Sequence, residues 1–310
     1  MMQERGIVSI LKGREVPILL NTGAQRAGAA QSAALIQSFG QAGVHARLVR
    51  VQPSRLRLTL TRLLELDTPV VAVAGGDGTI SAGAAIMAGT AAVLVPVPLG
   101  TQNHFARRYG LATLAAVAHA LRAGTILRVP VGELNGRTFV NNASCGVYAH
   151  LVRHRERLRM LIPNGPAALL AALWVLARRP LLDLELEVNG SASHRRTAAA
   201  WVGIGRNSLR LPAPGDAAHA GDLLELVLPR PRSRMVLLAL AHRLWRRLRQ
   251  QQTAQDAELE ILRAPAFALR SERLMPIALD GEVQFWSGPL HFQYRPDALR
   301  VLCLVTPDSA

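Results

Sequence analysis

One short apolar run limits the folds open to this chain. Residues 69–74 are all apolar, and the turn Gly75-Gly76-Asp77-Gly78-Thr79 follows them at once. A strand that is apolar along its whole length is typical of a parallel sheet with helices on both faces. Strand and helix patterns alternate from residue 16 onward, as such a sheet requires. We therefore expect the first 127 residues to form a three-layer α/β domain with a mostly parallel sheet.

The elements of this first domain follow from hydrophobic periodicity. Apolar residues at helical spacing predict helices, and short apolar runs predict strands. We expect strands at residues 16–20, 44–51, 69–74 and 91–96, and helices at 24–42, 56–66, 80–88 and 113–122.

The pattern changes after Gly124. Short strands follow, and the dipeptides Asn135-Gly136 and Asn189-Gly190 are strong hairpin signals. We expect residues 128–310 to form a mainly antiparallel β-sandwich, whose last ~20 residues pack back on the first domain. The expected strands are 127–131, 138–141, 182–188, 197–204, 223–228, 258–262, 266–269, 277–279 and 298–305, with helices at 167–177 and 234–252.

Composition bounds the class of protein. The chain has 310 residues, half of them hydrophobic, which is enough for the cores of two domains. Its two cysteines, Cys145 and Cys303, have neither metal-like spacing nor a disulfide framework, so an intracellular protein is indicated. The longest apolar run, at 166–177, is shorter than the ~20 residues that span a bilayer. We expect a cytoplasmic protein that can lie on the inner face of the cell membrane.

The formal net charge is +15, and Lys12 is the only lysine, so 36 − 1 = 35 basic residues are arginine. A GC-rich genome and an anionic partner explain this bias equally well. Residues 235–250 place leucines and Trp245 on one helical face and arginines mostly opposite, which suits an anionic membrane surface. A core-packed helix with a solvated basic face is the alternative, here and at 153–159. The sequence contains no aromatic stacking motif of the kind that binds nucleic acid, so a nucleic-acid partner is not expected.

The glycine turn carries the strongest functional signal. Glycines let a backbone approach an anion closely, and the N–H groups at a helix start attract negative charge. Asp77 would repel phosphate unless a cation such as Mg²⁺ lies between them. Thr79 can bond a phosphate oxygen or cap the helix. An ordinary strand-to-helix turn is the alternative, but this string in this context predicts a site for a nucleoside triphosphate, with Gly75, Gly76 and Gly78 beside the phosphates.

A second polar loop, residues 98–107, follows the next strand. Two consecutive loops at one edge of a parallel sheet form a single crevice, where open α/β sheets bind ligands. Gly100, Thr101 and Asn103 are candidates to bind phosphate or ribose, although Asn103 is equally suited to cap a helix. Arg107 and Arg108 are suited to offset phosphate charge.

Together these two loops resemble the catalytic domain of diacylglycerol, sphingosine and related lipid kinases. A bacterial branch with Asn-His-Phe-Ala-Arg in the second loop is closely similar. The resemblance spans most of the chain. It continues at Asn135-Gly136-Arg137, at Phe139-Val140-Asn141-Asn142, at Gly146 and at Asp280-Gly281-Glu282, while Asn21-Thr22-Gly23 loosely matches the family's first phosphate loop.

The resemblance implies a mechanism. A lipid lies between a nucleotide-binding α/β domain and a β-sandwich domain, and its hydroxyl attacks the γ-phosphate of ATP with Mg²⁺ assistance. Glu282 matches the base, Asp280 is its competitor, Asp77 lies by the metal and phosphates, and Asn21 belongs to the nucleotide site. A hydroxyl is a weak nucleophile, so a carboxylate that takes its proton helps. Burial of the carboxylate near other acids would raise its pKa, which suits a base.

Several acidic positions of the family are absent here. Ala82, His104, Pro130 and Ala220 stand where relatives often carry a carboxylate. A non-catalytic nucleotide or lipid sensor is therefore one alternative. An enzyme similar to NAD kinases, with a soluble substrate, is another, although the string at 98–107 favours the lipid kinases. The expected partners are a nucleotide and a lipid substrate at an anionic membrane surface, with no nucleic acid; a homodimer is compatible with the sequence.

Overall fold

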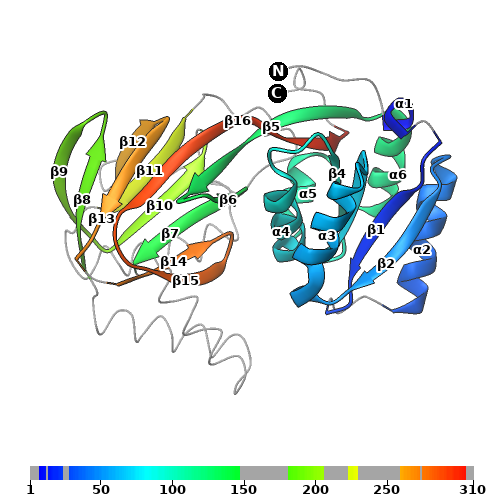
Figure 1. Cartoon of the computed structure of the whole chain (residues 1–310), viewed down its shortest axis with the longest axis horizontal. Coiled ribbons are helices and arrows are strands. Elements are labelled where there is room, and N and C mark those ends of the chain that lie inside the picture. Colours follow the sequence, from blue (N-terminus) through cyan, green and yellow to red (C-terminus); the bar gives the residue numbers. More distant parts are fainter. Residues whose placement is uncertain are drawn as a thin grey trace. The chain divides into compact units, whose positions relative to one another are not determined.

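The computed structural model describes residues 7–11, 13–23, 28–146, 181–205, 223–229, 259–272 and 274–304. The described chain forms two compact units (Figure 1). The first holds the described residues up to Asn141 and those from Tyr294 onward; the second holds the described residues from Asn142 to Gln293. The domain bounds expected from the sequence, 1–127 and 128–310, stay a prediction.

The first unit alternates helices and strands. Its elements are α1 (Ile7–Leu11), β1 (Val16–Asn21), α2 (Ala29–Gln41), β2 (Ala46–Val51), η1 (Pro53–Arg55), α3 (Leu56–Glu65), β3 (Val70–Gly75), α4 (Asp77–Met87), β4 (Val93–Pro98), α5 (His104–Arg108), α6 (Leu114–Ala123), β5 (Thr125–Leu134), β6 (Arg137–Phe139) and the end of β16 (Leu290–Cys303).

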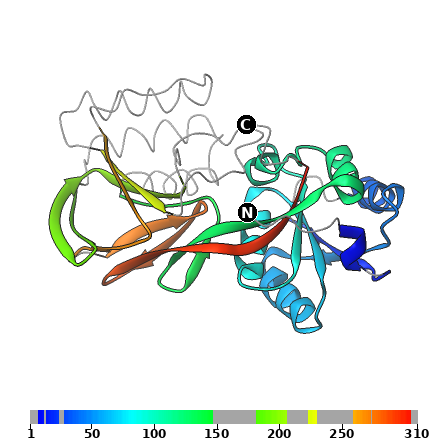
Figure 2. The same cartoon turned by 90° about the horizontal axis from the view of Figure 1, so that it is seen from above.

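The sheet of this unit runs in the order β2-β1-β3-β4-β16 with parallel pairing. Every residue of β3 is buried, as the apolar run predicted, and every residue of β4 is buried too. Helix α3 packs with α4, whereas α2 packs with α6. Figure 2 shows α3 on one side of the sheet and α2 with α6 on the other. The predicted three-layer α/β architecture is confirmed.

The four predicted strands and four predicted helices of this half are present, with shifted ends. The shift that matters is at α4, which begins at Asp77 rather than at Ile80, so Asp77, Gly78 and Thr79 form its first turn. The short helices α1 and α5 were not predicted. Residues 24–27, which open the helix predicted at 24–42, lie outside the described part of the chain.

The second unit is built from antiparallel strands. One sheet has the order β12-β11-β10-β7-β14-β15, and the other joins β16, β13, β8 and β9. This confirms the predicted antiparallel fold, although β7, β9 and β15 were not predicted. The strands are β7 (Asn142–Gly146), β8 (Leu182–Val188), β9 (Ser191–Thr197), β10 (Ala199–Ile204), β11 (Leu224–Pro229), β12 (Leu259–Ala264), β13 (Ala266–Arg270), β14 (Met275–Leu279), β15 (Glu282–Trp286) and the start of β16.

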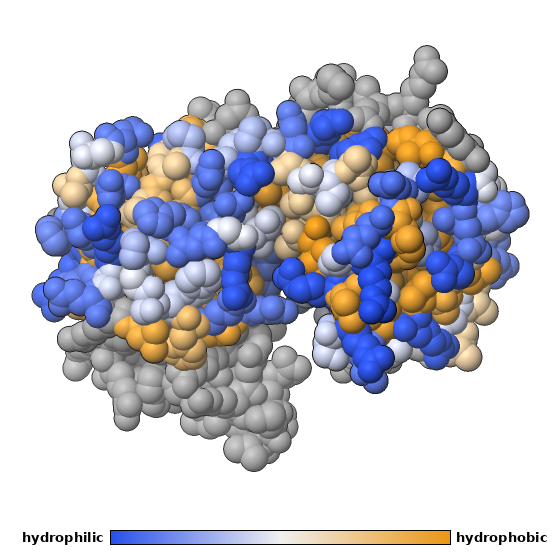
Figure 3. Space-filling model, viewed as in Figure 1, coloured by the Kyte–Doolittle hydropathy of each residue, from blue (hydrophilic) through white to orange (hydrophobic). Residues whose placement is uncertain are grey.

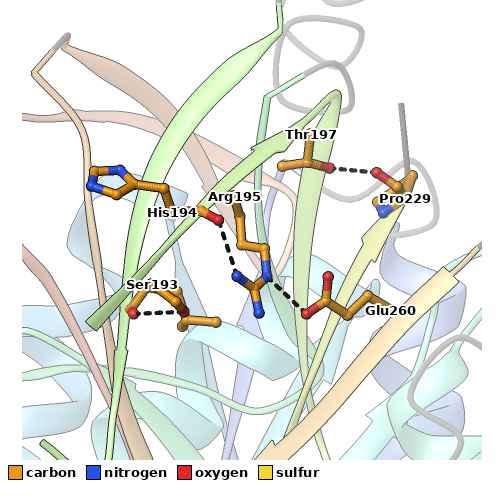
Figure 4. Close-up of polar contacts among 7 residues, drawn as sticks. Ser193, His194, Arg195, Thr197, Pro229 and Glu260 are labelled. Atoms are coloured by element: carbon orange, nitrogen blue, oxygen red, sulfur yellow. Dashed lines mark hydrogen bonds and ion pairs between the residues drawn. The ribbon is translucent and has the colours of Figure 1, made fainter. Parts of the chain in front are cut away.

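Contacts at one edge join the two sheets of the second unit (Figure 4). Arg195 Nε on β9 donates to Glu260 Oε1 on β12 at 2.8 Å. The buried Thr197 donates from Oγ1 to the carbonyl oxygen of Pro229, at the end of β11, at 2.9 Å. These bonds show that Glu260 lies on the face of its sheet that looks toward β9.

Three hairpins have both turn residues at positive φ, the conformation of a type I′ turn. The predicted turns Asn135-Gly136 and Asn189-Gly190 are confirmed, with φ of 46° and 80° and of 51° and 77°. The third is Asp280-Gly281, at 48° and 93°, between β14 and β15. Asparagine, aspartate and glycine tolerate this region best, which explains these residue types at the three turns.

Some sequence predictions lie outside the described residues. They are the helices at 167–177 and 234–252, the basic cluster at 153–159 and the position of Ala220. Among the helices that are described, none is long and apolar enough to cross a membrane.

The packing around Gly124 gives a test of the first unit. A Cβ added at Gly124 would lie 2.6 Å from the carbonyl oxygens of both Ala120 and Cys303. Both are backbone atoms and cannot swing away, so we expect Gly124→Ala to lower the free energy of unfolding by about 1–3 kcal/mol. Urea unfolding followed by circular dichroism measures this change.

The matched control is Gly40→Ala. Gly40 is exposed in α2, and its added Cβ would have no heavy atom within 4 Å. Alanine favours a helix over glycine by up to about 1 kcal/mol, so this variant should gain stability. Equal effects of the two substitutions would contradict the packing at Gly124.

Candidate functional site

The loops that follow β1, β3 and β4 meet at one edge of the first unit's sheet. These three strands are neighbours and parallel, so their carboxyl ends lie together. The chain order reverses beside β1, with β2 on one side and β3 on the other. In open α/β sheets this switch point is where ligands bind. The edge is therefore the place to look for a site.

The glycine turn supplies a helix start at this edge. Strand β3 ends at Gly75, Gly76 is the N-cap residue with φ −82° and ψ 179°, and α4 then runs for 11 residues. Gly76 has no side chain with which to cap the helix. The first N–H groups of a helix have no partner within it, so those of the first turn are available to an anion.

The glycines bring the two predicted loops into contact. A Cβ on Gly100 would lie 2.8 Å from Gly76 Cα, and a Cβ on Gly75 would lie 2.6 Å from Thr79 Cβ. Larger residues at these positions would force the backbones apart. The N–H of Leu99 also donates to the carbonyl oxygen of Gly75 at 2.9 Å. The turns after β3 and β4 are thus one structural cluster.

Asp77 connects α4 to α5. Its Oδ1 accepts a hydrogen bond from the backbone N–H of Phe105 at 3.2 Å, and the side chain is half-buried. Phe105 is itself buried against Tyr109, with ring centroids 5.0 Å apart. Burial raises the pKa of Tyr109, so this ring stays neutral. Through its bond to Phe105, Asp77 lies between the starts of α4 and α5. Its carboxylate has lone pairs left that can bind a further ligand.

Asn103 closes the second loop. It adopts a left-handed conformation, with φ 53° and ψ 42°, at the N-cap position of α5. Its Oδ1 accepts from the N–H of Gly100 at 2.9 Å, and its Nδ2 donates to the carbonyl oxygen of Gly100 at 2.9 Å. Asn103 thus shapes the turn beside Gly76 instead of capping the helix with its side chain. Thr101 and Arg107 are exposed at the same loop.

Asn21 joins this cluster from the end of β1. Its Nδ2 donates to Thr79 Oγ1 at 2.7 Å, and its Oδ1 accepts from the N–H of Gly23 at 2.9 Å. Because the Thr79 oxygen accepts this bond, its hydroxyl hydrogen can point to another acceptor. The structure therefore brings together Asn21, Thr79 and Asp77, which are far apart in sequence.

Ser81 was not singled out from the sequence. It is buried in α4, and its Oγ accepts a hydrogen bond from Asn141 Nδ2 at 2.9 Å. A serine inside an apolar helix was the only signal available. The bond anchors the end of the Phe139-Val140-Asn141 segment on the helix that begins with Asp77.

The Asp280-Gly281-Glu282 motif lies in the second unit. Asp280 Oδ1 accepts from the N–H of Asn142 at 3.1 Å, and the N–H of Asp280 donates to the carbonyl oxygen of Asn142 at 2.9 Å. Asp280 therefore holds the β14–β15 turn against the start of β7. Glu282 is the first residue of β15, and its side chain is exposed. Glu282 therefore lacks the burial that would suit a base, because the hairpin presents it to solvent.

The structure places three of the positions at which the resemblance implies that an acid is absent. Ala82 is half-buried in α4 and packs against the core, His104 is the half-buried first residue of α5, and Pro130 lies within β5. Cys145, by contrast, offers no nucleophile, because burial raises the pKa of its thiol to about 12.

Comparison with known proteins agrees with this geometry. The family model of the diacylglycerol kinase catalytic domain matches residues 15–134. A "probable lipid kinase YegS-like" protein of Pseudomonas fluorescens Pf-5 is 30% identical over 308 residues, 97% of this chain and 96% of that protein. Its namesake in Pseudomonas syringae pv. syringae B728a is 29% identical over 237 residues, 74% of each chain.

A solved structure supports the fold. The crystal structure of a diacylglycerol kinase from Bacillus anthracis strain Sterne superposes with a TM-score of 0.67 at 12% identity, and it covers 94% of this chain and 97% of its own. The likeness to the Pseudomonas fluorescens protein extends over nearly the whole of both chains. This chain therefore belongs to the diacylglycerol kinase family of lipid kinases.

Proposed function

We propose that this protein transfers the γ-phosphate of ATP, with Mg²⁺ assistance, to a hydroxyl of a diacylglycerol-like lipid. The observation that supports it is the cluster in the first unit. The start of α4, the Gly100–Asn103 turn and the side chain of Asn21 are joined there by hydrogen bonds and close backbone contacts. Such a cluster is suited to hold a polyphosphate, because helix N–H groups and hydroxyls face one edge.

The chain's own groups suit the nucleotide in three ways. The uncapped N–H groups at the start of α4 attract phosphate oxygens. Thr79 has a hydroxyl hydrogen to donate, because Asn21 occupies its oxygen. Arg107 is exposed on α5 and can offset phosphate charge.

Asp77 fits a role beside Mg²⁺. This ion is usually held by one or two carboxylates together with substrate phosphates. One oxygen of Asp77 accepts the N–H of Phe105, which fixes the carboxylate and leaves its other lone pairs for a cation. When bound, Mg²⁺ offsets the negative charge of the phosphates and of Asp77.

Glu282 is the residue we assign as base. In the proposed step the lipid oxygen forms a bond to the γ-phosphorus, the bond from that phosphorus to the β,γ-bridging oxygen breaks, and the hydroxyl proton passes to Glu282. Asp280 is less suited, because its Oδ1 accepts the N–H of Asn142 and holds the turn. Glu282 is exposed, so it is free to meet a substrate.

We further propose that the lipid is taken from an anionic membrane surface on the cytoplasmic side. The net charge of +15 supports this, because basic proteins are attracted to anionic lipid headgroups.

Transfer of radiolabelled phosphate from ATP into a total lipid extract tests the function. A labelled lipid, identified by its mobility and mass, supports the proposal. ATP binding without any labelled product would identify a sensor instead. Label in a soluble acceptor such as NAD, but in no lipid, would identify a kinase of soluble substrates.

We predict that Asp77→Ala abolishes transfer while the protein remains folded. Asp77→Asn keeps an oxygen that can accept the Phe105 N–H but removes the charge. It should therefore match wild type in thermal unfolding and still lose transfer, if the charge serves the cation. Full activity in folded Asp77→Asn would remove Asp77 from the site.

Asn21→Asp tests the polarity of the Thr79 bond. The change keeps the shape of the side chain but removes the N–H that Thr79 Oγ1 accepts. Aspartate would accept the Thr79 hydrogen and add a negative charge near phosphate, so we expect affinity for ATP to fall about tenfold or more. Titration calorimetry measures it. Asn189→Asp, at the hairpin turn of the second unit, is the control for charge alone and should bind ATP normally.

Glu282→Gln tests the base. Glutamine keeps the size and reach of the side chain but cannot take the proton. Turnover should fall by roughly 10²–10⁴-fold while ATP affinity changes little. Asp280→Asn is measured in the same assay of ATP binding and lipid phosphorylation. Near-normal turnover in Glu282→Gln would refute its role, and a large loss in Asp280→Asn alone would move the role to Asp280.

A further inference from the structure

Two hydrogen bonds hold neighbouring residues where the chain passes from the first unit to the second. Asn141 ends a segment of the first unit, and Asn142 is the first residue of the second unit. Within the first unit, Asn141 Nδ2 donates to Ser81 Oγ at 2.9 Å. Within the second unit, the N–H of Asn142 donates to Asp280 Oδ1 at 3.1 Å. A single peptide unit therefore separates an anchor on α4 from an anchor on the β14–β15 turn.

The first anchor lies on the face of α4 that carries Asp77. Ser81 follows Asp77 by four residues, so the two side chains share one face of the helix, about 6 Å apart along its axis. Ser81 is 3% exposed, and its helix neighbours Ile80 and Ala84 are buried and apolar. Burying a hydroxyl in such surroundings is unfavourable unless it is hydrogen-bonded. The bond to Asn141 therefore fixes where this part of the chain meets the helix.

The second anchor lies on the turn that precedes Glu282. Asp280 and Asn142 are joined by two bonds, because the N–H of Asp280 also donates to the carbonyl oxygen of Asn142 at 2.9 Å. Glu282 follows two residues after Asp280, as the first residue of β15. The two bonds therefore set the direction of the turn, and with it the point from which the Glu282 side chain extends.

The position of the β14–β15 hairpin depends on its β7 side. Among the described strands β15 is the last of its sheet, whereas β14 pairs with β7. Phe285 on β15 is 49% exposed, and Figure 3 shows hydrophobic surface over the hairpin. An exposed hairpin at a sheet edge is held less firmly than a central strand. The bonds of Asn142, at the start of β7, therefore matter for where Glu282 lies.

The link between the two anchors is short and stiff. The peptide bond between Asn141 and Asn142 is trans, so it is planar and holds their Cα atoms ~3.8 Å apart. Only two soft backbone torsions, ψ of Asn141 and φ of Asn142, can turn within it. A shift of α4 that Asn141 follows is therefore passed on to Asn142 and to the turn at Asp280.

We propose that Asn141 is a positioning residue for the phosphate transfer, because its bond to Ser81 couples α4 to the turn that presents Glu282. This rests on the proposed function, in which Glu282 takes the proton of the lipid hydroxyl. A nucleotide that orders the start of α4 then orders the base as well, through the two anchors. Asn141 itself contacts neither phosphate nor lipid. Its loss should slow the chemical step and leave the binding of both substrates unchanged.

Hydrogen exchange of the Asp280 amide tests the coupling without catalysis. This N–H donates to Asn142, so its protection reports the bond at the turn. Ser81→Ala removes the acceptor of the Asn141 bond, and alanine suits a helix. Exchange at Asp280 should become about 3–10-fold faster in folded Ser81→Ala, which corresponds to the usual net contribution of one hydrogen bond. Unchanged exchange would overturn the proposal.

Thr113→Ala is the matched control. Thr113 Oγ1 accepts the N–H of Ala116 at 3.1 Å at the start of α6, so this variant also loses one hydroxyl bond in the first unit. It weakens a helix cap and leaves the Ser81–Asn141 bond in place. Exchange at Asp280 should stay as in wild type. Equally faster exchange in both variants would mean that any weakening of the first unit reaches the turn, and it would refute a role for this bond.

Kinetics test the consequence for the reaction. The assay uses labelled ATP and dioleoylglycerol in mixed micelles. Asn141→Ala and Ser81→Ala should each lower kcat by about 10–100-fold, because a reacting group displaced by ~1 Å loses much of its effect. The KM for the lipid and the Kd for ATP should change little. The double variant should be no slower than the slower single variant, because both changes remove the same bond. A raised KM with unchanged kcat, or losses that multiply, would contradict positioning through this bond.

The two readouts separate this inference from the kinase activity. If wild type transfers no phosphate while Ser81→Ala still speeds exchange at Asp280, the kinase proposal fails and the coupling stands. If wild type transfers phosphate and the variants at Ser81 and Asn141 keep its kcat, the coupling serves no step of the reaction, and this inference fails alone.

Discussion

The contact between Gly76 and Gly100 decides the geometry of the first unit's site. A Cβ on Gly100 would come within 2.8 Å of Gly76 Cα, so the loops after β3 and β4 can touch only without side chains there. This contact places the N–H of Phe105 within reach of Asp77 and sets the Asn103 turn beside the start of α4. With larger residues the two helix starts would separate, and the carboxylate would lose the bond that orients it.

Much of the first unit could be read from the sequence, because its physical signals are local. A short, wholly apolar run such as β3 favours a strand that is buried on both faces. The glycines after it indicate that another backbone segment approaches closely. The helix boundary was wrong for a local reason. Asp77, Gly78 and Thr79 are weak helix formers, yet at a first turn their backbone N–H groups need no intrahelical partner.

The second unit was less predictable, because its strands depend on their neighbours. Strand β7 reads Asn-Ala-Ser-Cys-Gly and β9 reads Ser-Ala-Ser-His-Arg-Arg-Thr, with few residues that favour strands. They form because β10 and β14 flank β7, and β8 pairs with β9 along its length. Similarly, the sequence named Asp280-Gly281-Glu282 but could not tell that Asp280 would hold the turn while Glu282 stayed exposed. That division follows from the left-handed backbone at Asp280 and its bonds to Asn142.

The acids that the resemblance implies to be absent would change the electrostatics of the proposed site in a definite direction. Ala82 lies five residues after Asp77 on α4, about 1.4 turns further along the helix, and His104 precedes Phe105, whose N–H donates to Asp77. A carboxylate at either position would add negative charge close to a bound triphosphate. Without it, a cation would have less repulsion to offset, and Asp77 would supply more of the negative charge near the phosphates. A site of this kind depends less on a cluster of acids and more on helix N–H groups, hydroxyls and arginine, which are the groups that its loops supply.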